Sequence, residues 1–376
     1  MKILYDLSYT QNRDFYSGLY EYGKKIFSEI LKKHGNDITV LLIKGEEIDQ
    51  FVLDSKCNIV YADYKYGTKA FWKNVSNILL EFDRAIFPYQ LIKNSIKVPK
   101  NCELYFTIHD LSQLILATFT KINKEEKYYN SGKDRFIKYP IKQVLRFTGL
   151  FKFYLKRNLK KNIKQATKII TISEFSKQEI IREFKVDSSK IEVSYAPLKL
   201  LSSKEAPKVD YTDYFLFVSA SRYTKNTYRG LRALDDIWDE NKDFPKAVVA
   251  GALPDSIYQR LRNKDKVISL GYVSEADLEY LYKNANALIF TSLCEGFGSP
   301  PLEAMRYGTR VVSSNAMSLK ELYFDTLLFD PYDVNDIKNK ILAYKTISND
   351  KMIEIFNRVN NRCEEDVLKL VDILVK

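Results

Sequence analysis

Two carboxylates stand eight positions apart in the segment 293–305, Glu295 and Glu303, with Gly296 and Gly298 between them. Glycine lacks a Cβ, so the backbone between the carboxylates can bend sharply and come close to a ligand. Ionised carboxylates accept hydrogen bonds, so these two suit the hydroxyl groups of a sugar and of a ribose rather than phosphate oxygens. The spacing therefore predicts a clamp that grips opposite ends of one ligand.

The elements around this segment are expected to aim backbone N–H groups at the ligand. An apolar run, Ala287–Phe290, predicts a buried parallel strand, and residues 299–305 have the composition and spacing of a helix. Ser299 and the two prolines after it fit the cap and first turn, where a missing N–H group costs little. The free N–H groups and the positive dipole end then form an anion site that suits a diphosphate. An ordinary strand-to-helix turn, in which Glu303 only favours the helix N-terminus, is the alternative.

Three motifs of this region resemble one family of enzymes. Glu295–Met305, Arg310–Asn315 and Ser318–Glu321 resemble the Glu-x7-Glu region of the retaining glycosyltransferases of family 4 (glycosyltransferase group 1), which include mannosyl- and rhamnosyltransferases. The resemblance implies the α/β GT-B fold, with two Rossmann-like domains that face each other across a cleft. It also implies transfer of a hexose or deoxyhexose from a nucleoside-diphosphate sugar to a glycan, with retention at the anomeric carbon. Neither a metal ion nor a separate cofactor is expected.

The same resemblance assigns roles to single residues in the second half of the chain. Phe215–Asn226 looks like the strand and loop that end in Lys-Asn, so Lys225 is expected to neutralise the donor diphosphate. At Ser219 and Ala220 the family often has Gly and Arg, which makes Arg222 the candidate for the second cation. A plain surface lysine is the alternative for Lys225. The residues expected to bind the donor are Ser219, Val273, Gly296, Phe297, Gly298, Ser299 and Glu303, and those expected to act in catalysis are Arg222, Lys225 and Glu295.

The first half of the chain carries weaker matches. Tyr105–Leu111 resembles the strand-end His-Asp of the family, whose histidine lies against the transferred sugar, so His109 is expected to be catalytic. This position fits the carboxyl end of a strand, where open α/β sheets hold ligands. A histidine with only a structural role is the alternative. Gly18 resembles the glycine of the family's first loop and is expected to bind the donor, whereas Ser173–Lys177 matches a signature with a structural role.

Length and composition fit two domains. The chain has 376 residues, 45% of them hydrophobic, which is enough for two cores. It contains no run of about 20 apolar residues and no signal-peptide pattern, so a cytoplasmic location is expected. Four scattered cysteines and two histidines indicate neither a disulfide framework nor a zinc site. The sequence has no P-loop motif and no Asp-x-Asp, which argues against nucleotidases and metal-dependent GT-A transferases.

Strand and helix patterns alternate along the chain, which predicts parallel sheets with helices on both faces. The polar segment 201–208 separates two such series. The predicted domains are residues 1–200 for the acceptor, residues 201–350 for the donor, and a C-terminal helix at 351–376, for which packing against the first domain is a hypothesis. The predicted strands are Ile3–Leu7, Thr39–Ile43, Asn58–Tyr61, Ala85–Phe87, Glu103–Ile108, Lys168–Ile172, Lys190–Ser194, Tyr214–Ser219, Lys246–Gly251, Val267–Leu270, Ala287–Phe290, Arg310–Ser313 and Leu327–Phe329.

The excess of positive charge is confined to the first half of the chain. Residues 1–200 contain 35 Lys/Arg and 22 Asp/Glu, whereas residues 201–376 contain 24 and 26. Within residues 133–168, twelve Lys/Arg are interleaved with aromatic and aliphatic side chains and with a single acid, Asp134. This composition is typical of a segment that lies on an anionic membrane surface, although a solvated basic helix is the alternative.

The expected acceptor follows from this charge pattern. It is a lipid-linked glycan at the inner face of the plasma membrane, as in the synthesis of a bacterial surface polysaccharide or glycoconjugate, and the enzyme would attach there peripherally through residues 133–168. A soluble glycan or a protein acceptor is the alternative.

Two other classes of protein stay open. A GT-B relative without transferase activity, such as a nucleotide-sugar epimerase, a hydrolase or a non-catalytic subunit, would hydrolyse, epimerise or only bind the donor in the absence of an acceptor. A basic nucleic-acid-binding protein would bind nucleic acid in a salt-dependent way. That class leaves the motifs of the second half unexplained, so no nucleic-acid partner is expected.

Overall fold

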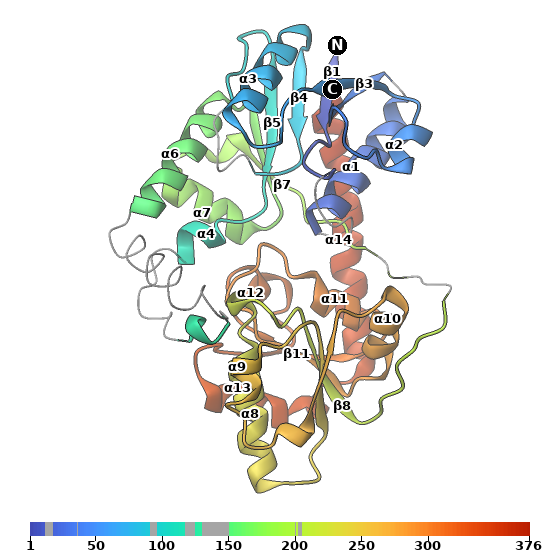
Figure 1. Cartoon of the computed structure of the whole chain (residues 1–376), viewed down its shortest axis with the longest axis vertical. Helices are drawn as coiled ribbons and strands as arrows, with labels where there is room; N and C mark the ends of the chain where they lie inside the picture. Colours follow the sequence, from blue (N-terminus) through green and yellow to red (C-terminus); the bar gives the residue numbers. More distant parts are fainter. Residues whose placement is uncertain are drawn as a thin grey trace. The chain divides into compact units, whose positions relative to one another are not determined.

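In the computed structural model the chain divides into two compact units, each with its own sheet (Figure 1). Unit 1 contains residues 1–114, 149–197 and 362–376, and unit 2 contains residues 115–148 and 198–361. The structure describes residues 1–11, 18–35, 37–90, 96–116, 125–129, 150–199, 201 and 205–376.

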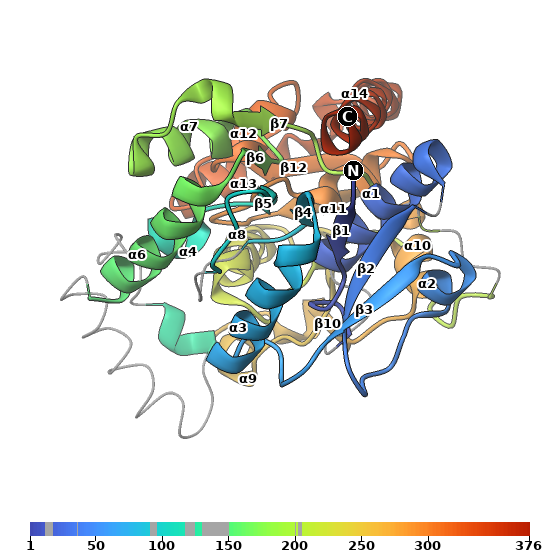
Figure 2. The same ribbon diagram turned by 90° about the horizontal axis from the view of Figure 1, so that it is seen from above.

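Unit 1 is built on a parallel sheet. Its described strands lie in the order β3-β2-β1-β4-β5-β6-β7, and neighbours pair in parallel throughout. Figure 2 shows β1, β2 and β3 side by side, in blue. The elements of this part of the chain are β1 (Ile3–Asp6), α1 (Gly18–His34), β2 (Ile38–Ile43), α2 (Gln50–Asp54), β3 (Asn58–Ala62), α3 (Lys69–Ile78), β4 (Arg84–Phe87), β5 (Glu103–Ile108), α4 (Ser112–Leu116), α6 (Leu150–Gln165), β6 (Lys168–Thr171), α7 (Glu174–Phe184) and β7 (Ile191–Val193).

Unit 2 repeats the design with described strands in the order β10-β9-β8-β11-β12-β13, again all parallel. Its elements are the short 3-10 helix η3 (Glu126–Tyr129), β8 (Tyr214–Val218), the 3-10 turn η6 (Tyr223–Lys225), α8 (Thr227–Glu240), β9 (Lys246–Ala250), α9 (Asp255–Tyr258), β10 (Val267–Gly271), α10 (Glu275–Asn284), β11 (Ala287–Phe290), α11 (Ser299–Met305), β12 (Arg310–Ser314), α12 (Ser318–Leu322), β13 (Leu327–Phe329), α13 (Val334–Leu342) and α14 (Asn349–Val375).

The central strands of unit 2 are covered on both faces. Every residue of β8 and β11 is buried, as expected for continuous apolar runs in a parallel sheet. Helix α8 lies close against this sheet, because a Cβ on Gly230 would come within 2.6 Å of the Phe217 ring and 2.8 Å of the Thr291 methyl group. This close packing fixes the helix that starts directly after the Lys225 loop.

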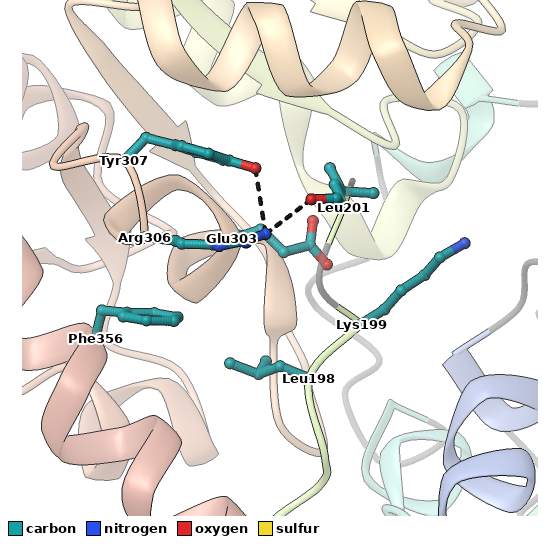
Figure 3. Close-up of a pocket in the computed structure, with 7 residues that line it drawn as sticks. All are labelled: Leu198, Lys199, Leu201, Glu303, Arg306, Tyr307 and Phe356. Atoms are coloured by element: carbon teal, nitrogen blue, oxygen red, sulfur yellow. Dashed lines mark hydrogen bonds between the residues drawn. The ribbon is translucent and has the colours of Figure 1, made fainter. Parts of the chain in front are cut away.

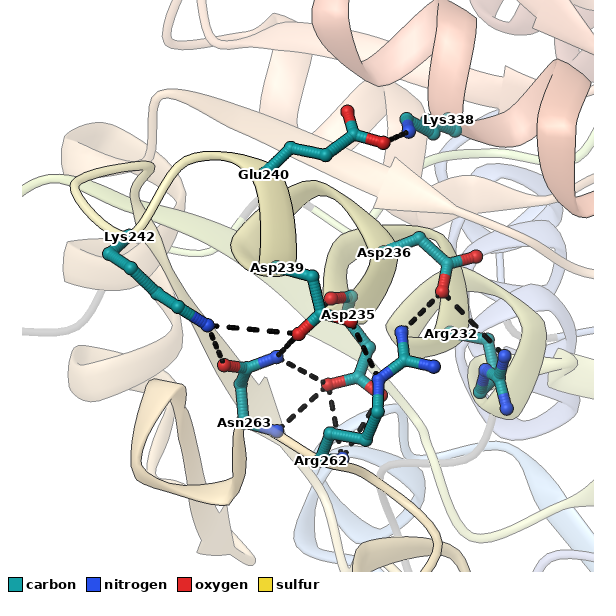
Figure 4. A network of polar contacts seen from close by, with 9 residues as sticks. All are labelled: Arg232, Asp235, Asp236, Asp239, Glu240, Lys242, Arg262, Asn263 and Lys338. Carbon is teal, nitrogen blue, oxygen red and sulfur yellow. Dashed lines mark hydrogen bonds and ion pairs between the residues drawn. The ribbon is translucent and has the colours of Figure 1, made fainter.

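An acidic cluster on α8 has a structural role (Figure 4). The buried Asp235 carboxylate accepts backbone N–H bonds from Arg262 at 3.0 Å and Asn263 at 2.9 Å. The Arg262 side chain pairs with Asp236 and Asp239. The cluster therefore anchors the segment before β10 onto α8, and its charges are already satisfied within the protein.

Helix α14 runs through both units along the sequence, and its residues from Arg362 onward belong to unit 1. There the Arg84 guanidinium donates to the Leu374 carbonyl oxygen at 2.8 Å and pairs with Glu103. The Tyr195 N–H donates to Asp366 of the helix at 3.2 Å. Backbone and charged contacts thus fix the end of the helix to the first sheet.

Each strand predicted from the sequence is confirmed, with ends that agree within one residue. The units divide the chain differently from the predicted domains. Residues 125–129, which the prediction placed in the first domain, group with unit 2, where Tyr128 and Tyr129 pack against its core. The C-terminal helix is also divided, with its residues up to 361 in unit 2 and those from 362 onward in unit 1. In the part of the chain that the structure describes, no helix is long and apolar enough to cross a membrane.

Candidate active site

The strand order of unit 2 reverses between β8 and β11. From β8 the chain continues to β9 and β10 on one side of the sheet, and it then returns to form β11, β12 and β13 on the other side. Such reversal points, at the carboxyl ends of the strands, are where open α/β sheets bind ligands. The loop at 219–226 follows β8 and the segment 291–299 follows β11, so both motifs with expected chemistry lie at this position.

The segment after β11 holds the loop after β8 in place. The hydroxyl groups of Thr291 and Ser292 donate to the carbonyl oxygens of Lys225 at 2.7 Å and of Thr224 at 3.1 Å. The N–H of Leu293 donates to the same Thr224 oxygen at 2.7 Å. These bonds satisfy backbone groups that would otherwise be unpaired in a partly buried loop, and they fix the end of the loop that carries Lys225.

Lys225 and Glu295 form an ion pair. The distance from Nζ to Oε1 is 2.6 Å, and the two side chains are only 11% and 16% exposed. The lysine also lies 5.4 Å from the centre of the Phe290 ring. A shielded charge needs a partner, so each residue holds the other in position. Arg222 is exposed, and no carboxylate of the described residues lies within ion-pair distance of it.

Gly298 turns the chain into helix α11. Its φ is 86°, a left-handed conformation that favours glycine, and a Cβ here would lie 2.5 Å from the side chain of Leu319. The Tyr323 hydroxyl donates to the Gly298 carbonyl oxygen at 2.6 Å. The helix begins at Ser299, so Gly298 occupies the cap position expected for the serine. The helix has only seven residues, Ser299–Met305.

The turn between Glu295 and Gly298 contains buried residues and is held by the side chain of Ser318, which lies later in the sequence. Gly296 and Phe297 are both buried. The Ser318 hydroxyl lies 2.8 Å from the Glu295 carbonyl oxygen and 3.5 Å from that of Phe297. The Ser318 hydroxyl therefore holds the backbone of the turn at both of these residues.

Glu303 lies in the second turn of α11, on the wall of a small pocket (Figure 3). The Tyr282 hydroxyl donates to Glu303 Oε2 at 2.8 Å. Burial raises the pKa of the Glu303 carboxyl, while the Tyr282 hydroxyl and then Lys199 and Lys225 act in the opposite direction. One carboxylate oxygen is thus held by the protein. The pocket is lined by Leu198, Lys199, Leu201, Glu303, Arg306, Tyr307 and Phe356.

Ser219 and Val273 follow β8 and β10, on either side of β9. Ser219 has a φ of 58°, which is uncommon for a residue with a side chain. Gly251, at the end of β9, donates its N–H to the Gly271 carbonyl oxygen at 2.7 Å, and a Cβ on it would lie 3.2 Å from the Ala220 nitrogen. The three strand ends therefore pack backbone against backbone.

The two remaining predicted residues, His109 and Gly18, lie in unit 1. His109 follows β5 and is buried; its Nε2 donates to the Pro88 carbonyl oxygen at 3.0 Å, so Nδ1 is the acceptor. The ring meets that of Tyr22 edge-on at 4.7 Å. Burial lowers the pKa of His109, so the imidazole is neutral at pH 7. Gly18 is the exposed first residue of α1, with open space where a Cβ would lie.

Sequence reasoning missed the residues that hold the site together: Tyr282, Thr291, Ser318 and Tyr323. Tyr282, Thr291 and Tyr323 belong to none of the motifs that the sequence analysis used, and Tyr282 is 21 positions away from Glu303 in the sequence. Ser318 was part of a matching motif, but its target, the Glu295 carbonyl oxygen, is visible only in the structure. Among the described residues no group of His, Cys, Asp or Glu side chains is arranged to hold a metal ion.

Two Rossmann-like units, with a cation and two carboxylates at the reversal point of the second sheet, define a GT-B protein. Solved structures with the GT-B fold agree with this class. The structure of Anabaena Alr3699/HepE in complex with UDP and glucose matches 100% of this chain and 99% of its own, with a TM-score of 0.64 at 15% identity. At this identity the likeness concerns the fold.

The second unit matches a family model. Residues 201–357 match the model of the glycosyl transferases group 1, a match that covers less than half of the chain. It is 30% identical over 219 residues to the O-antigen chain mannosyltransferase B of Escherichia coli, covering 54% of this chain and 57% of that protein. It is 31% identical over 215 residues to the O-antigen chain mannosyltransferase RfbU of Salmonella typhimurium strain LT2, covering 56% and 58%. The matches thus span little more than half of each relative.

Proposed function

We propose that this protein is a retaining glycosyltransferase that moves a hexose or deoxyhexose from a nucleoside-diphosphate sugar to a glycan acceptor in bacterial surface polysaccharide synthesis. The observation that carries the proposal is the Lys225–Glu295 ion pair at the β8/β11 reversal point. A cation there suits a leaving diphosphate, and a carboxylate beside it suits the hydroxyl groups of the sugar next to that diphosphate. The names of the O-antigen mannosyltransferases support mannose as the sugar to test first.

Binding of the donor would exchange one set of partners for another. Lys225 would move from Glu295 to the diphosphate, and the freed Glu295 would accept from sugar hydroxyls. Arg222, which is exposed, would supply a second positive charge, and Glu303 would accept from ribose hydroxyls. The bonded backbone at 291–298 would keep its geometry, so the cost of reorganisation stays small.

The chemistry proposed here uses no nucleophilic side chain. The leaving phosphate would take the proton of the attacking acceptor hydroxyl, and Lys225 would balance the negative charge that develops on the diphosphate. His109, neutral because its burial lowers its pKa, would serve as a hydrogen-bonding group against the transferred sugar and not as a cation. No step of this scheme needs a metal ion.

The donor is tested by thermal shift with UDP, GDP and dTDP. We expect one diphosphate to raise the melting temperature, because a ligand that binds only the folded state stabilises it by RT ln(1 + [L]/Kd). The matching nucleotide sugar should then be consumed only with an acceptor present. Release of free sugar, or an epimerised donor, in the absence of acceptor would support a non-transferase GT-B relative instead.

We also propose a lipid-linked acceptor, reached through the basic face of α6. Leu155, Leu159 and Ile163 are buried at helical spacing, and the opposite face exposes cations together with Phe153, which is 65% exposed. Residues 133–149 of the basic segment lie outside the described residues. The cations that the α6 face exposes are Arg157, Lys160, Lys161 and Lys164.

Lys156 differs from this set, because its Nζ pairs with Glu183 at 3.0 Å. No described carboxylate lies within ion-pair distance of the other four. Each Lys or Arg at an anionic membrane contributes about 1 kcal/mol, so the four together would contribute about 4 kcal/mol, the scale of weak, reversible binding. An amphipathic helix with aromatic residues beside its cations is suited to such a surface.

Liposome flotation tests the membrane proposal. The wild type should float with anionic vesicles at low salt and less at high salt, whereas the variant with Arg157, Lys160, Lys161 and Lys164 changed to Ser should float poorly and still bind nucleotide. A control with the same loss of charge, Lys246, Lys340, Lys345 and Lys376 changed to Ser, should float like the wild type. Equal flotation with neutral vesicles, or none with anionic ones, would exclude the membrane surface and favour a soluble acceptor.

A further inference from the structure

A short segment from the first half of the sequence packs on unit 2 beside the loop after β8. Residues 125–129 belong to unit 2, and both Tyr128 and Tyr129 lie against its core. The centres of the Tyr128 and Tyr228 rings lie 5.3 Å apart, and the Arg260 guanidinium lies 4.0 Å from the centre of the Tyr128 ring. The segment is thus fixed by aromatic and cation–π contacts on two sides.

The Tyr129 hydroxyl caps helix α8. The N–H of Tyr228, in the first turn, donates to the Tyr129 oxygen at 2.9 Å. First-turn N–H groups have no partner within the helix and are usually capped by the residue just before it. Here that residue, Asn226, has a left-handed backbone and its side chain makes no capping bond. Tyr129 therefore supplies the cap from a distant part of the sequence.

Glu125 fixes the same turn through Arg229. Arg229 Nη2 lies 3.0 Å from Glu125 Oε2, and Nη1 of the same guanidinium donates to Asn226 Oδ1 at 3.0 Å. The Asn226 amide donates in turn to the Pro331 carbonyl oxygen at 2.8 Å. The Arg229 and Glu125 side chains are 12% and 26% exposed, so solvent screens the pair less than it screens a surface ion pair. These bonds therefore hold Asn226, the residue directly after Lys225, from both sides.

The ring of Tyr129 holds the other end of the loop. It lies 5.7 Å from the Tyr223 ring at an interplanar angle of 76°. Tyr223 is the first residue of the turn whose last residue is Lys225. The turn is thus fixed at its first residue, Tyr223, and directly after its last residue, Lys225. Such rigidity matters at a reacting centre, where a displacement of about 1 Å can cost about 100-fold in rate.

We propose that Glu125 and Tyr129 are positioning residues that hold the loop at 223–226 so that Lys225 meets the diphosphate of the donor. The inference rests on the proposed function, because it takes Lys225 as the diphosphate cation. Neither residue touches the donor itself. Both lie outside residues 201–357, so the geometry of the donor loop depends on a segment that the family match does not include.

Two conservative variants test this role against a matched control. Tyr129→Phe keeps the ring and removes the hydroxyl, and Glu125→Gln keeps the shape and removes the charge. Tyr128→Phe removes a neighbouring hydroxyl that makes no hydrogen bond to the described residues. Tyr129→Phe and Glu125→Gln should each bind the diphosphate selected by the thermal-shift screen about 10-fold more weakly than the wild type, as measured by calorimetry. This is the scale of a weakened charged hydrogen bond, here the one from Lys225 to the diphosphate. Both variants should bind the matching nucleoside, which has no phosphate, with the affinity of the wild type. Tyr128→Phe should bind both the nucleoside and the diphosphate with wild-type affinity.

A merely structural segment predicts a different pattern. Tyr129→Phe should have no further effect on diphosphate affinity in a Lys225→Ala background, because the residue acts only through that lysine. Equal losses for nucleoside and diphosphate, or a full additional loss in that background, would overturn the positioning role. A wild type that binds none of the three diphosphates would overturn the proposed function, whereas wild-type binding with unaffected variants would overturn this inference alone.

Discussion

The Lys225→Ala variant is expected to transfer sugar at least ~100-fold more slowly than the wild type, the scale for losing one preorganised partner of a developing anion. Lys225 lies at the β8/β11 reversal point, with its Nζ 2.6 Å from Glu295 and little exposure to solvent. Without the lysine the leaving diphosphate loses its cation, and Glu295 remains as an unpaired carboxylate that repels phosphate. Initial rates at saturating donor measure the effect.

The ion pair makes the effects of the two residues interdependent. Glu295→Gln should lower turnover with the intact donor. Its affinity for the free diphosphate should be unchanged or higher, since Lys225 is then released from its ion pair with Glu295. The double variant should lose less than the product of the two single losses, because the repulsion left by Lys225→Ala disappears with the carboxylate. Lys338→Ala, which removes a lysine paired with Glu240 elsewhere in unit 2, is the control and should be near wild type.

Arg222 provides the outcome that would contradict this assignment. If Lys225→Ala is near wild type while Arg222→Ala is inactive, the diphosphate cation is the exposed arginine and not the paired lysine. If both single variants and the double variant keep full activity, the diphosphate does not bind at this loop. Melting temperatures close to wild type are needed for either conclusion, since the loop also packs against Thr291 and Ser292.

The strands were readable from the sequence because each is a short apolar run between polar segments. Ala287–Phe290 and Tyr214–Val218, for example, are buried along their whole length, and a fully covered strand leaves a continuous hydrophobic signature. The motif glycine Gly298 was readable for a similar reason, since a left-handed turn before a helix strongly favours glycine. Local physics thus determined most of the fold.

The side-chain contacts within the site could not be predicted from the sequence, because they depend on which strands become neighbours. Lys225 and Glu295 were expected to bind different parts of the donor, and nothing in their spacing showed that they pair with each other. That contact exists because β11 returns to the side of β8 opposite to β9. Tyr129 is a stronger case: a helix cap is normally sought next to the helix, whereas this one comes from a segment that was assigned to the first domain.

The position of Glu303 allows a second prediction with a large effect. Glu303→Gln should weaken binding of the matching nucleoside diphosphate about 10- to 100-fold, because hydrogen bonds from ribose hydroxyls to a carboxylate contribute about 1.5–3 kcal/mol. The Tyr282 hydroxyl holds one carboxylate oxygen at 2.8 Å, and the side chain lies on the wall of the small pocket. Calorimetric titration at pH 7.5 gives the affinity. Glu354→Gln, an exposed glutamate of α14, is the control.

The pH dependence of binding separates this role from a structural one. Burial raises the pKa of Glu303, so on acidification it takes up its proton before an ordinary carboxyl group does. A protonated carboxyl accepts fewer hydrogen bonds, so diphosphate affinity should be highest above this pKa and should fall as the pH drops through it. In Glu303→Gln this decline should be smaller, because only the protonation of the phosphate then contributes to it. In Tyr282→Phe the decline should shift to higher pH, since the hydroxyl bond that favours the charged form of Glu303 is lost. An identical decline in wild type and Glu303→Gln would show that the carboxylate does not bind the nucleotide.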